Sequence, residues 1–138
     1  ANVYGPRQDN KGEAGVIAIF IENIIKGSVP TIYGDGSQTR DFIFIQDVVK
    51  ANLLALESSL IGIYNVSTSK ETSILDLFKV IKNVLSFPRH AKFGDLPSGE
   101  VRRSALDFQK LFSEAQWKPD FSIKEGIIKT CEWWKQFA

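Results

Sequence analysis

The sequence predicts a small mixed α/β fold with short strands and about five helices. Two observations support this fold class. Segments with helical periodicity alternate along the chain with short apolar runs, which is the pattern of a fold that combines helices with buried strands. The 138 residues are 43% apolar and 24% charged, which suits one globular domain that buries a core without disulfides or metal. We therefore expect residues 1–138 to form a single domain.

The first helix is expected to be buried on nearly all sides. Residues 1–12 end in Gly, Pro, Asp and Asn, which indicates a strand end that runs into a loop. The segment Gly15–Lys26 that follows is apolar almost all round, as in a helix without a solvent face. Gly27 stands where a glycine C-terminal cap belongs.

A strand, a turn, a second strand and a helix come next. Strands are expected at Pro30–Tyr33 and Arg40–Ile45, on either side of the turn Gly34–Gly36. Asp47 is placed to cap a helix over Val48–Glu57, because a carboxylate can accept hydrogen bonds from the free N–H groups at a helix start.

The middle of the chain predicts one more strand, the clearest helix and a long loop. Ile61–Val66 has the short apolar character of a fully buried strand. Ser73 opens a helix with an apolar face formed by Ile74, Leu77, Phe78, Ile81, Val84 and Leu85. The irregular segment Ser86–Ser104 is a candidate functional loop, with short strands expected at Ala91–Phe93 and Glu100–Arg103.

The last part of the chain predicts two helices. Asp107 is placed to cap a short helix, which the sequence Trp117-Lys118-Pro119 ends because proline cannot continue it. Ser122 and Glu125 have the spacing of a capping box, so a final amphipathic helix is expected to begin there.

Composition excludes several classes of function. A net charge of +1 provides no broad electrostatic field for nucleic acid or for an anionic membrane. One cysteine and one histidine leave no disulfide framework and no His/Cys cluster for a metal, and a reducing cytoplasm is the simplest expectation. The longest apolar run, Gly15–Ile21, is too short to span a bilayer. The chain contains no methionine, and we expect it to be processed or to be a fragment.

Arg40 is the first candidate for a binding residue. In an extended strand Arg40, Phe42 and Phe44 share one face, so the guanidinium lies at the edge of an apolar strand and needs a partner. Its fixed fork of donors fits phosphate oxygens. The alternative is a salt bridge within the protein, to a neighbour of Asp41 or to Asp47, and the residues alone leave both open.

Five further positions are weaker candidates. Thr31 and Tyr33 share a strand face, where the tyrosine could stack on a planar base or simply belong to the core. The pair Arg102-Arg103 could meet a diphosphate or could be a solvated basic pair. Asn2, near a strand end, could hydrogen-bond a ligand or hold a turn.

No catalytic set is visible in the sequence. It contains no G-x-G-x-x-G, no phosphate-binding G-x-x-x-x-G-K, no Tyr-x-x-x-Lys pair and no G-x-S-x-G elbow. His90 is expected to be a surface-loop histidine and Cys131 an inert core thiol. We therefore expect no catalytic residue and no metal ligand in this chain.

Five stretches together carry a resemblance. They are ANVYGPRQ at 1–8, IYGDGSQTRDFIFIQDVVKANLLALE at 32–57, YNVSTSKETSI at 64–74, PSGEVRRSALD at 97–107 and WKPDFSIKEGI at 117–127. In this order they resemble the C-terminal part of the NAD-dependent nucleotide-sugar epimerase/dehydratase family, extended short-chain dehydrogenases with a Rossmann-type fold. The UDP-glucose 4-epimerases are its nearest members.

The resemblance implies that this chain is a substrate-binding portion that does not catalyse alone. In the family, NAD and the catalytic Ser/Thr and Tyr-x-x-x-Lys groups belong to an N-terminal Rossmann domain, which this chain lacks. A UDP-sugar or another nucleotide-sugar is the implied ligand, and a homodimer is the implied state of the parent. A 4,6-dehydratase, a decarboxylase and a stand-alone nucleotide-sugar-binding module remain alternatives, and so does a purely structural domain.

The resemblance also implies roles for particular residues. Asn2 would bond the phosphate or sugar, Val16 and Ile17 would contact the nucleotide, Thr31 and Tyr33 would flank the base, and Arg40 would bind the diphosphate.

Glu100 would accept hydrogen bonds from the ribose hydroxyls. The family's turn begins with an arginine where this sequence has Pro97, so Arg102 or Arg103 is expected to substitute for that cation. Exposed apolar surface after Arg40 and around Tyr64 is also expected, with association of the isolated chain as its consequence.

Overall fold

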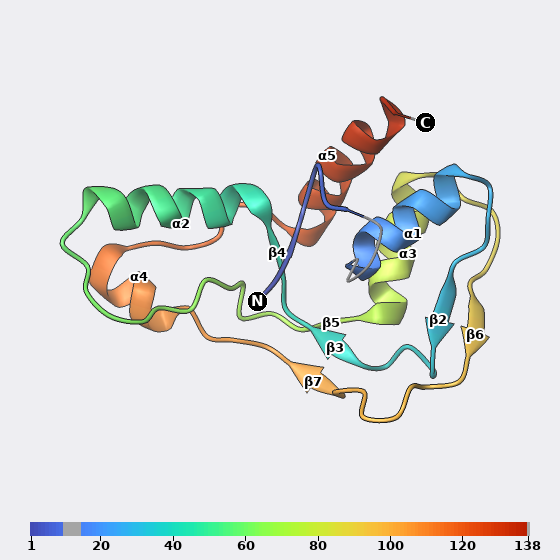
Figure 1. Cartoon of the computed structure of the whole chain (residues 1–138), viewed down its shortest axis with the longest axis horizontal. Coiled ribbons are helices and arrows are strands. Elements are labelled where there is room, and N and C mark those ends of the chain that lie inside the picture. Colours follow the sequence, from blue (N-terminus) through green and yellow to red (C-terminus); the bar gives the residue numbers. More distant parts are fainter. Residues whose placement is uncertain (10–14, 138) are drawn as a thin grey trace.

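The computed structural model describes residues 1–9 and 15–137, which form a mixed α/β fold with five helices and seven short strands (Figure 1). In chain order the elements are β1 (Asn2–Tyr4), α1 (Val16–Ile25), β2 (Thr31–Tyr33), β3 (Thr39–Arg40), β4 (Phe42–Phe44), α2 (Ile45–Glu57), β5 (Thr72–Ser73), α3 (Ile74–Val84), β6 (Lys92–Gly94), β7 (Arg103–Ser104), α4 (Gln109–Ala115) and α5 (Ile123–Lys135). Helices α2 and α4 lie at one end and strands β2 and β6 at the other (Figure 1). The predicted fold class is confirmed.

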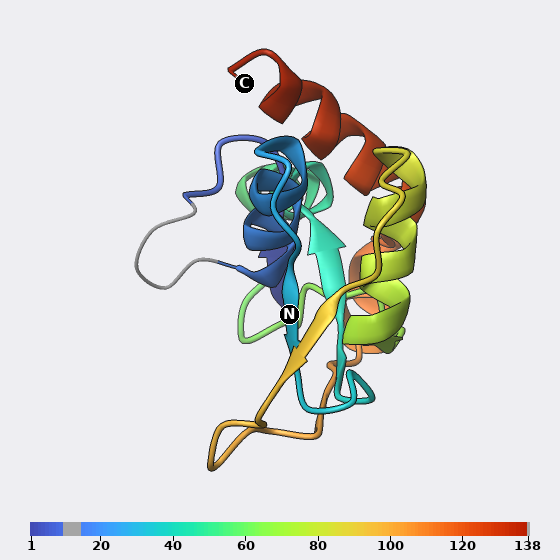
Figure 2. The same ribbon diagram turned by 90° about the vertical axis from the view of Figure 1, so that its right-hand side faces the viewer.

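The main core lies where α1, α3 and α5 pack against one another and against β4 (Figure 2). Helix α1 buries residues on most of its circumference, as its sequence predicts, and only Ile19 among its isoleucines is as much as 38% exposed. The buried members of this core include Tyr4, Ile17, Phe20, Ile21, Ile24, Phe44, Leu77, Phe78, Ile81, Ile127 and Cys131. A second, smaller core between α2 and α4 contains Ile43, Ala51, Leu111 and Trp117.

The strands form three small sheets. Strand β1 runs parallel to β4, with Val3 opposite Ile43, and β2 runs parallel to β6, with Ile32 opposite Phe93. Strand β3 lies between β5, which is antiparallel to it, and β7, which is parallel to it. The chain therefore passes from one sheet into another between β3 and β4.

Three predicted helix ends are confirmed. Gly27 has a φ of +73°, and the N–H groups of Gly27 and Ser28 bond Ile24 O and Asn23 O, which closes α1 in a Schellman motif. Ser73 accepts a hydrogen bond from Asp76 N at the start of α3. Ser122 and Glu125 form the expected capping box of α5.

The single strand expected at Arg40–Ile45 is in fact two. It breaks at Asp41 into β3 and β4, and helix α2 begins at Ile45. The alternation of faces is nevertheless correct where the site needs it, because Arg40 and Phe42 line the same pocket while Asp41 is fully buried.

Asp47 is not the cap of α2, which begins earlier, at Ile45 with Phe44 as its N-cap. The Asp47 side chain is 1% exposed and accepts hydrogen bonds from the backbone N–H groups of Asp120 and Phe121. Its carboxylate therefore ties α2 to the segment before α5, a contact across 73 residues that a local capping pattern does not show.

The buried strand expected at Ile61–Val66 is wrong. This segment has no strand structure, and Ile61 and Ile63 are 91% and 88% exposed. The described residues provide no strand beside it, and of its side chains Tyr64 and Val66 are partly buried against the second core.

Smaller differences concern element ends. The strand expected at Glu100–Arg103 is β7 at Arg103–Ser104, and Asp107 accepts from Gln109 N although Phe108 is the N-cap of α4. The last residues of the expected strand-to-loop segment 1–12 lie outside the described part of the chain.

No helix in residues 1–9 and 15–137 is long and apolar enough to cross a membrane. The same residues contain no group of three or more His, Cys, Asp or Glu side chains that could hold a metal ion.

Candidate functional site

A pocket of about 250 Å³ gathers most of the predicted binding residues. It opens between the start of α1, strands β2 and β3, and the loop that precedes β7. Six of its lining residues were predicted from sequence: Asn2, Val16, Thr31, Tyr33, Arg40 and Glu100. They come from segments spread over about a hundred residues of chain, so the fold has to be formed before the pocket exists.

Arg40 lies at the centre of the polar side of this pocket. Its Nη1 donates to Val101 O at 2.6 Å and to Thr39 O at 2.8 Å, and its Nη2 donates to the carboxylate of Glu100. Within residues 1–9 and 15–137 these bonds engage three of the five guanidinium N–H donors, which leaves two for a ligand oxygen. The alternative of a salt bridge within the protein is therefore confirmed, but with Glu100 as the partner. Asp47 is not the partner, because its carboxylate accepts from the backbone N–H groups of Asp120 and Phe121.

Tyr33 and Thr31 form the wall contributed by β2. The Tyr33 side chain is 55% exposed, so its interpretation as a core residue is wrong. The backbone carbonyl of Tyr33 accepts a hydrogen bond from Gln38 Nε2 at 2.9 Å, which holds the turn between β2 and β3 closed. An exposed aromatic ring at a pocket mouth is free to stack on a planar ligand.

Asn2 and Val16 complete the pocket from the N-terminal side, and Ile17 does not. The side chain of Asn2 donates to the carbonyl of Asp41 at 3.3 Å, next to Arg40 in the chain. Val16 is the first residue of α1 and lines the pocket, whereas Ile17 is 1% exposed and its side chain belongs to the main core.

Arg102 and Arg103 line a neighbouring hollow of about 550 Å³ that shares Gln38 and Glu100 with the pocket. Arg103 Nε donates to the Glu71 carboxylate at 3.0 Å, and this bond lowers the pKa of Glu71 to about 2. The structure therefore brings these two arginines to the rim of the pocket and not into it.

Several lining residues were missed by sequence reasoning: Gly15, Phe20, Ile32, Gln38, Phe42, Ile74 and Pro97. The alternation of strand faces could have found Phe42, because it places this ring beside Arg40. Gln38 carries no comparable signal, since it stands in a turn whose closure only the folded structure shows.

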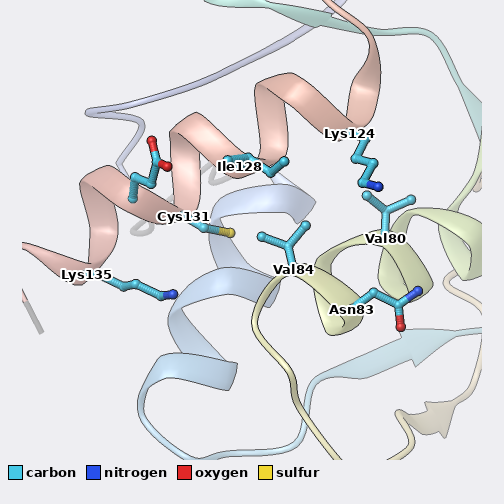
Figure 3. Close-up of a pocket in the computed structure, with 8 residues that line it drawn as sticks. Val80, Asn83, Val84, Lys124, Ile128, Cys131 and Lys135 are labelled. Carbon is cyan, nitrogen blue, oxygen red and sulfur yellow. The ribbon is translucent and has the colours of Figure 1, made fainter.

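A separate hollow of about 490 Å³ lies between α3 and α5 and contains none of the predicted site residues. Figure 3 shows Val84 of α3 and Cys131 of α5 directed into the space between the helices, with Lys124 and Lys135 along α5. Cys131 is 1% exposed and belongs to the main core, as predicted, and this burial raises the pKa of its thiol to about 12.

The chemistry of the pocket is that of binding. It offers a guanidinium, a carboxylate, two side-chain amides and three aromatic rings, of which that of Tyr33 is exposed, and none of its described lining residues is a cysteine, histidine or lysine. His90 is exposed and lies outside the pocket. This arrangement fits an anionic, planar and hydroxyl-bearing ligand.

Comparison with known proteins gives one consistent result. The profile of the NAD dependent epimerase/dehydratase family matches residues 1–67. A provisionally assigned UDP-glucose 4-epimerase of Methanocaldococcus jannaschii is 49% identical over 135 residues, which cover 98% of this chain and 44% of that protein. The UDP-glucose 4-epimerase of Mycolicibacterium smegmatis is 43% identical over 98% of this chain and 44% of its own length.

A solved structure agrees with these sequence relatives. The crystal structure of UDP-glucose 4-epimerase from Thermotoga maritima with UDP-glucose superposes with a TM-score of 0.95 at 40% identity, covering 99% of this chain and 44% of that one. The chain therefore spans less than half the length of the relatives that it matches.

Proposed function

We propose that the chain forms the nucleotide-sugar-binding portion of a longer epimerase. The proposal starts from the membership of the chain in the NAD-dependent epimerase/dehydratase family. In its most specific form the proposal is a UDP-sugar 4-epimerase, and this chain is its C-terminal substrate-binding part. The chain binds the substrate and does not catalyse alone.

One observation carries the proposal. Asn2, Thr31, Tyr33, Arg40 and Glu100, far apart in the sequence, line one pocket. Each has the chemistry that one part of a nucleotide-sugar requires: a cation for phosphate, a carboxylate for hydroxyl groups, and an aromatic ring for the base.

The proposed binding mode uses the donors that are free in the pocket. Arg40 holds the diphosphate with the two N–H groups not engaged by the protein, and Glu100 accepts from the ribose hydroxyls. Tyr33 and Thr31 flank the base. Asn2 reaches the sugar or phosphate.

The remaining predicted contacts complete the mode. Val16 and Ile17 meet the nucleotide where α1 begins, Ile17 through its backbone, because its side chain is buried in the core. Arg102 and Arg103 are the cations that a ligand extending past Glu100 would meet, and Arg103 is also paired with Glu71.

Binding of this kind contributes to the reaction through orientation. The nucleotide is remote from the reacting carbon of the sugar, but its binding fixes the sugar in one position. The reaction between the sugar and a catalytic group then becomes effectively intramolecular. In the parent enzyme NAD would supply hydride transfer. The chain contains no G-x-G-x-x-G, so the proposal assigns NAD binding to the rest of the parent.

The parent is proposed to be cytoplasmic, which the single cysteine favours. It is also proposed to be a homodimer, which the family resemblance implies. A dehydratase or decarboxylase would use the same nucleotide pocket, and product analysis of the full-length protein separates these reactions from epimerisation. A stand-alone binding module would lack an upstream dinucleotide motif in the same reading frame.

The test is titration calorimetry of the full-length parent with UDP. Arg40→Ala is expected to weaken binding by about 1.5–3 kcal/mol, the range for a hydrogen bond to a charged group. Arg89→Ala is the matched control, because Arg89 donates to Gly27 O on the surface and is absent from the pocket lining. Equal UDP affinity of the Arg40→Ala variant and the wild type would reject the proposed site.

A further inference from the structure

Asp41 carries a buried carboxylate to which the proposed function gives no role. It adjoins two residues of the proposed site, Arg40 in the chain and Asn2 through hydrogen bonds. It is fully buried, and it directly follows Arg40 at the point where the chain leaves β3 and enters β4. Its side chain points away from the pocket, so it cannot contact a ligand there. A carboxylate without access to water must be held by hydrogen bonds, and these bonds connect it to the site.

The carboxylate of Asp41 organises the turn that precedes β5. Its Oδ1 accepts from Thr68 N at 3.0 Å and from Thr68 Oγ1 at 2.6 Å, and its Oδ2 accepts from Ser69 N at 3.0 Å. Ser69 has a φ of +55°, in the left-handed region that a non-glycine residue avoids unless the surroundings impose it. The turn delivers β5 to its position beside β3, where Thr72 is opposite Arg40.

The backbone of Asp41 joins the two sheets that flank the pocket. Its N–H donates to Ser104 O at 3.0 Å, just after the loop that carries Glu100 and Val101. Its carbonyl accepts from both Asn2 N at 2.8 Å and Asn2 Nδ2 at 3.3 Å. Figure 1 shows the N-terminal end of the chain beside the junction of β3 and β4.

We propose that Asp41 is a positioning residue for nucleotide binding: its buried carboxylate fixes the β3–β4 junction so that Arg40 and Asn2 both face the pocket. The inference rests on the proposed function, since it assumes that Arg40 and Asn2 contact the ligand. Asp41 acts only through these neighbours. Without the Asp41 carboxylate, the Arg40 guanidinium would still be present, but its orientation toward the pocket would be less restricted.

The chain contains a matched control in Asp47. This aspartate is also buried, at 1% exposure, and also accepts backbone N–H groups, from Asp120 and Phe121. It lines no part of the pocket and its bonds tie α2 to the segment before α5. Replacing either aspartate with asparagine keeps the shape of the side chain and turns one accepting oxygen into an N–H donor, and only Asp41→Asn makes this change beside the pocket.

The test compares Asp41→Asn, Asp47→Asn and Arg40→Ala in the full-length parent, each shown to be folded by thermal unfolding. UDP binding to Asp41→Asn is expected to weaken about five- to tenfold, less than for complete loss of the guanidinium, while Asp47→Asn binds as the wild type does. The KM for the nucleotide-sugar should rise with unchanged kcat, because the lost interaction is made equally in ground and transition states.

Each outcome decides between the possibilities. Equal UDP affinities for Asp41→Asn and Asp47→Asn, or a reduced kcat at unchanged KM, would make Asp41 a purely structural residue and overturn the inference while the Arg40→Ala result still supports the proposed function. An Arg40→Ala variant that binds UDP normally would reject the proposed function, and the inference with it. If Asp41→Asn does not fold, Thr68→Val removes one hydrogen bond to the same carboxylate, and an unchanged KM in that variant would overturn the inference.

Discussion

Gly126→Ala is expected to destabilise the fold, although alanine is the better helix former. An ideal Cβ at position 126 of α5 would lie 2.1 Å from Tyr4 Oη, 2.8 Å from Tyr4 Cζ and 3.0 Å from Phe44 Cδ2. Tyr4 is 3% exposed and Phe44 1%, so neither ring has free space beside it. The Tyr4 hydroxyl also donates to Ile123 O at 3.3 Å and would lose this bond on moving.

The expected change in unfolding free energy is the sum of one stabilising and two destabilising contributions. Glycine in a helix interior costs about 1 kcal/mol relative to alanine, so the substitution gains that amount. Overpacking a filled core costs about 1–3 kcal/mol, and loss of the Tyr4 hydrogen bond adds about 1 kcal/mol. The net expectation is a loss of about 1–3 kcal/mol of unfolding free energy.

Urea denaturation of the wild type and the variant measures this loss as a lower midpoint at unchanged slope. Tyr4→Phe in the Gly126→Ala background removes the oxygen that collides first, so the double variant should be more stable than Gly126→Ala alone. A Gly126→Ala protein as stable as the wild type or more stable would refute the packing argument.

Three further predictions concern the thiol, the ion pair of Glu71 with Arg103, and the exposed isoleucines. Cys131 should react with a thiol reagent at pH 8 much more slowly in the folded than in the unfolded protein, because burial raises its pKa to about 12. Equal labelling rates would contradict its burial. The pKa of Glu71 is lowered from 4.5 to about 2, so this carboxylate contributes stability above its unfolded pKa that is lost as the pH falls through about 2. Between these two pKa values the denaturation midpoint of Arg103→Gln should depend less on pH than that of the wild type. Replacing Ile61 and Ile63 by lysine should reduce self-association of the isolated chain in light scattering, because both side chains are about nine-tenths exposed; unchanged association would mean that another surface is responsible.

Local patterns predicted the features that depend on neighbouring residues. The Schellman end at Gly27, the cap at Ser73 and the capping box at Ser122 each involve groups within five positions of one another. The buried character of α1 also followed from the sequence, because apolar residues on all sides of a helix require cover on all sides.

Contacts between distant segments could not be predicted in the same way. Arg40 pairs with Glu100, 60 residues away, and Asp47 bonds a backbone group 73 residues away, so the local rules proposed the wrong partner for one and the wrong role for the other. The apolar run Ile61–Val66 has the composition of a buried strand, but Ile61 and Ile63 are exposed and Tyr64 and Val66 are only partly buried, against the second core. Composition shows that an apolar segment favours burial, but it does not show whether another part of the chain covers that segment.

The central claim is that Arg40 binds the diphosphate of a nucleotide-sugar, and a crystal structure of the full-length parent with UDP tests it most directly. The account predicts a phosphate oxygen at about 2.7–2.9 Å from a guanidinium nitrogen of Arg40, the distance of a charge-assisted hydrogen bond. It also predicts the uracil ring beside Tyr33 and a ribose hydroxyl bonded to Glu100. A diphosphate bound elsewhere, with Arg40 still engaged only by Glu100, Val101 and Thr39, would contradict it.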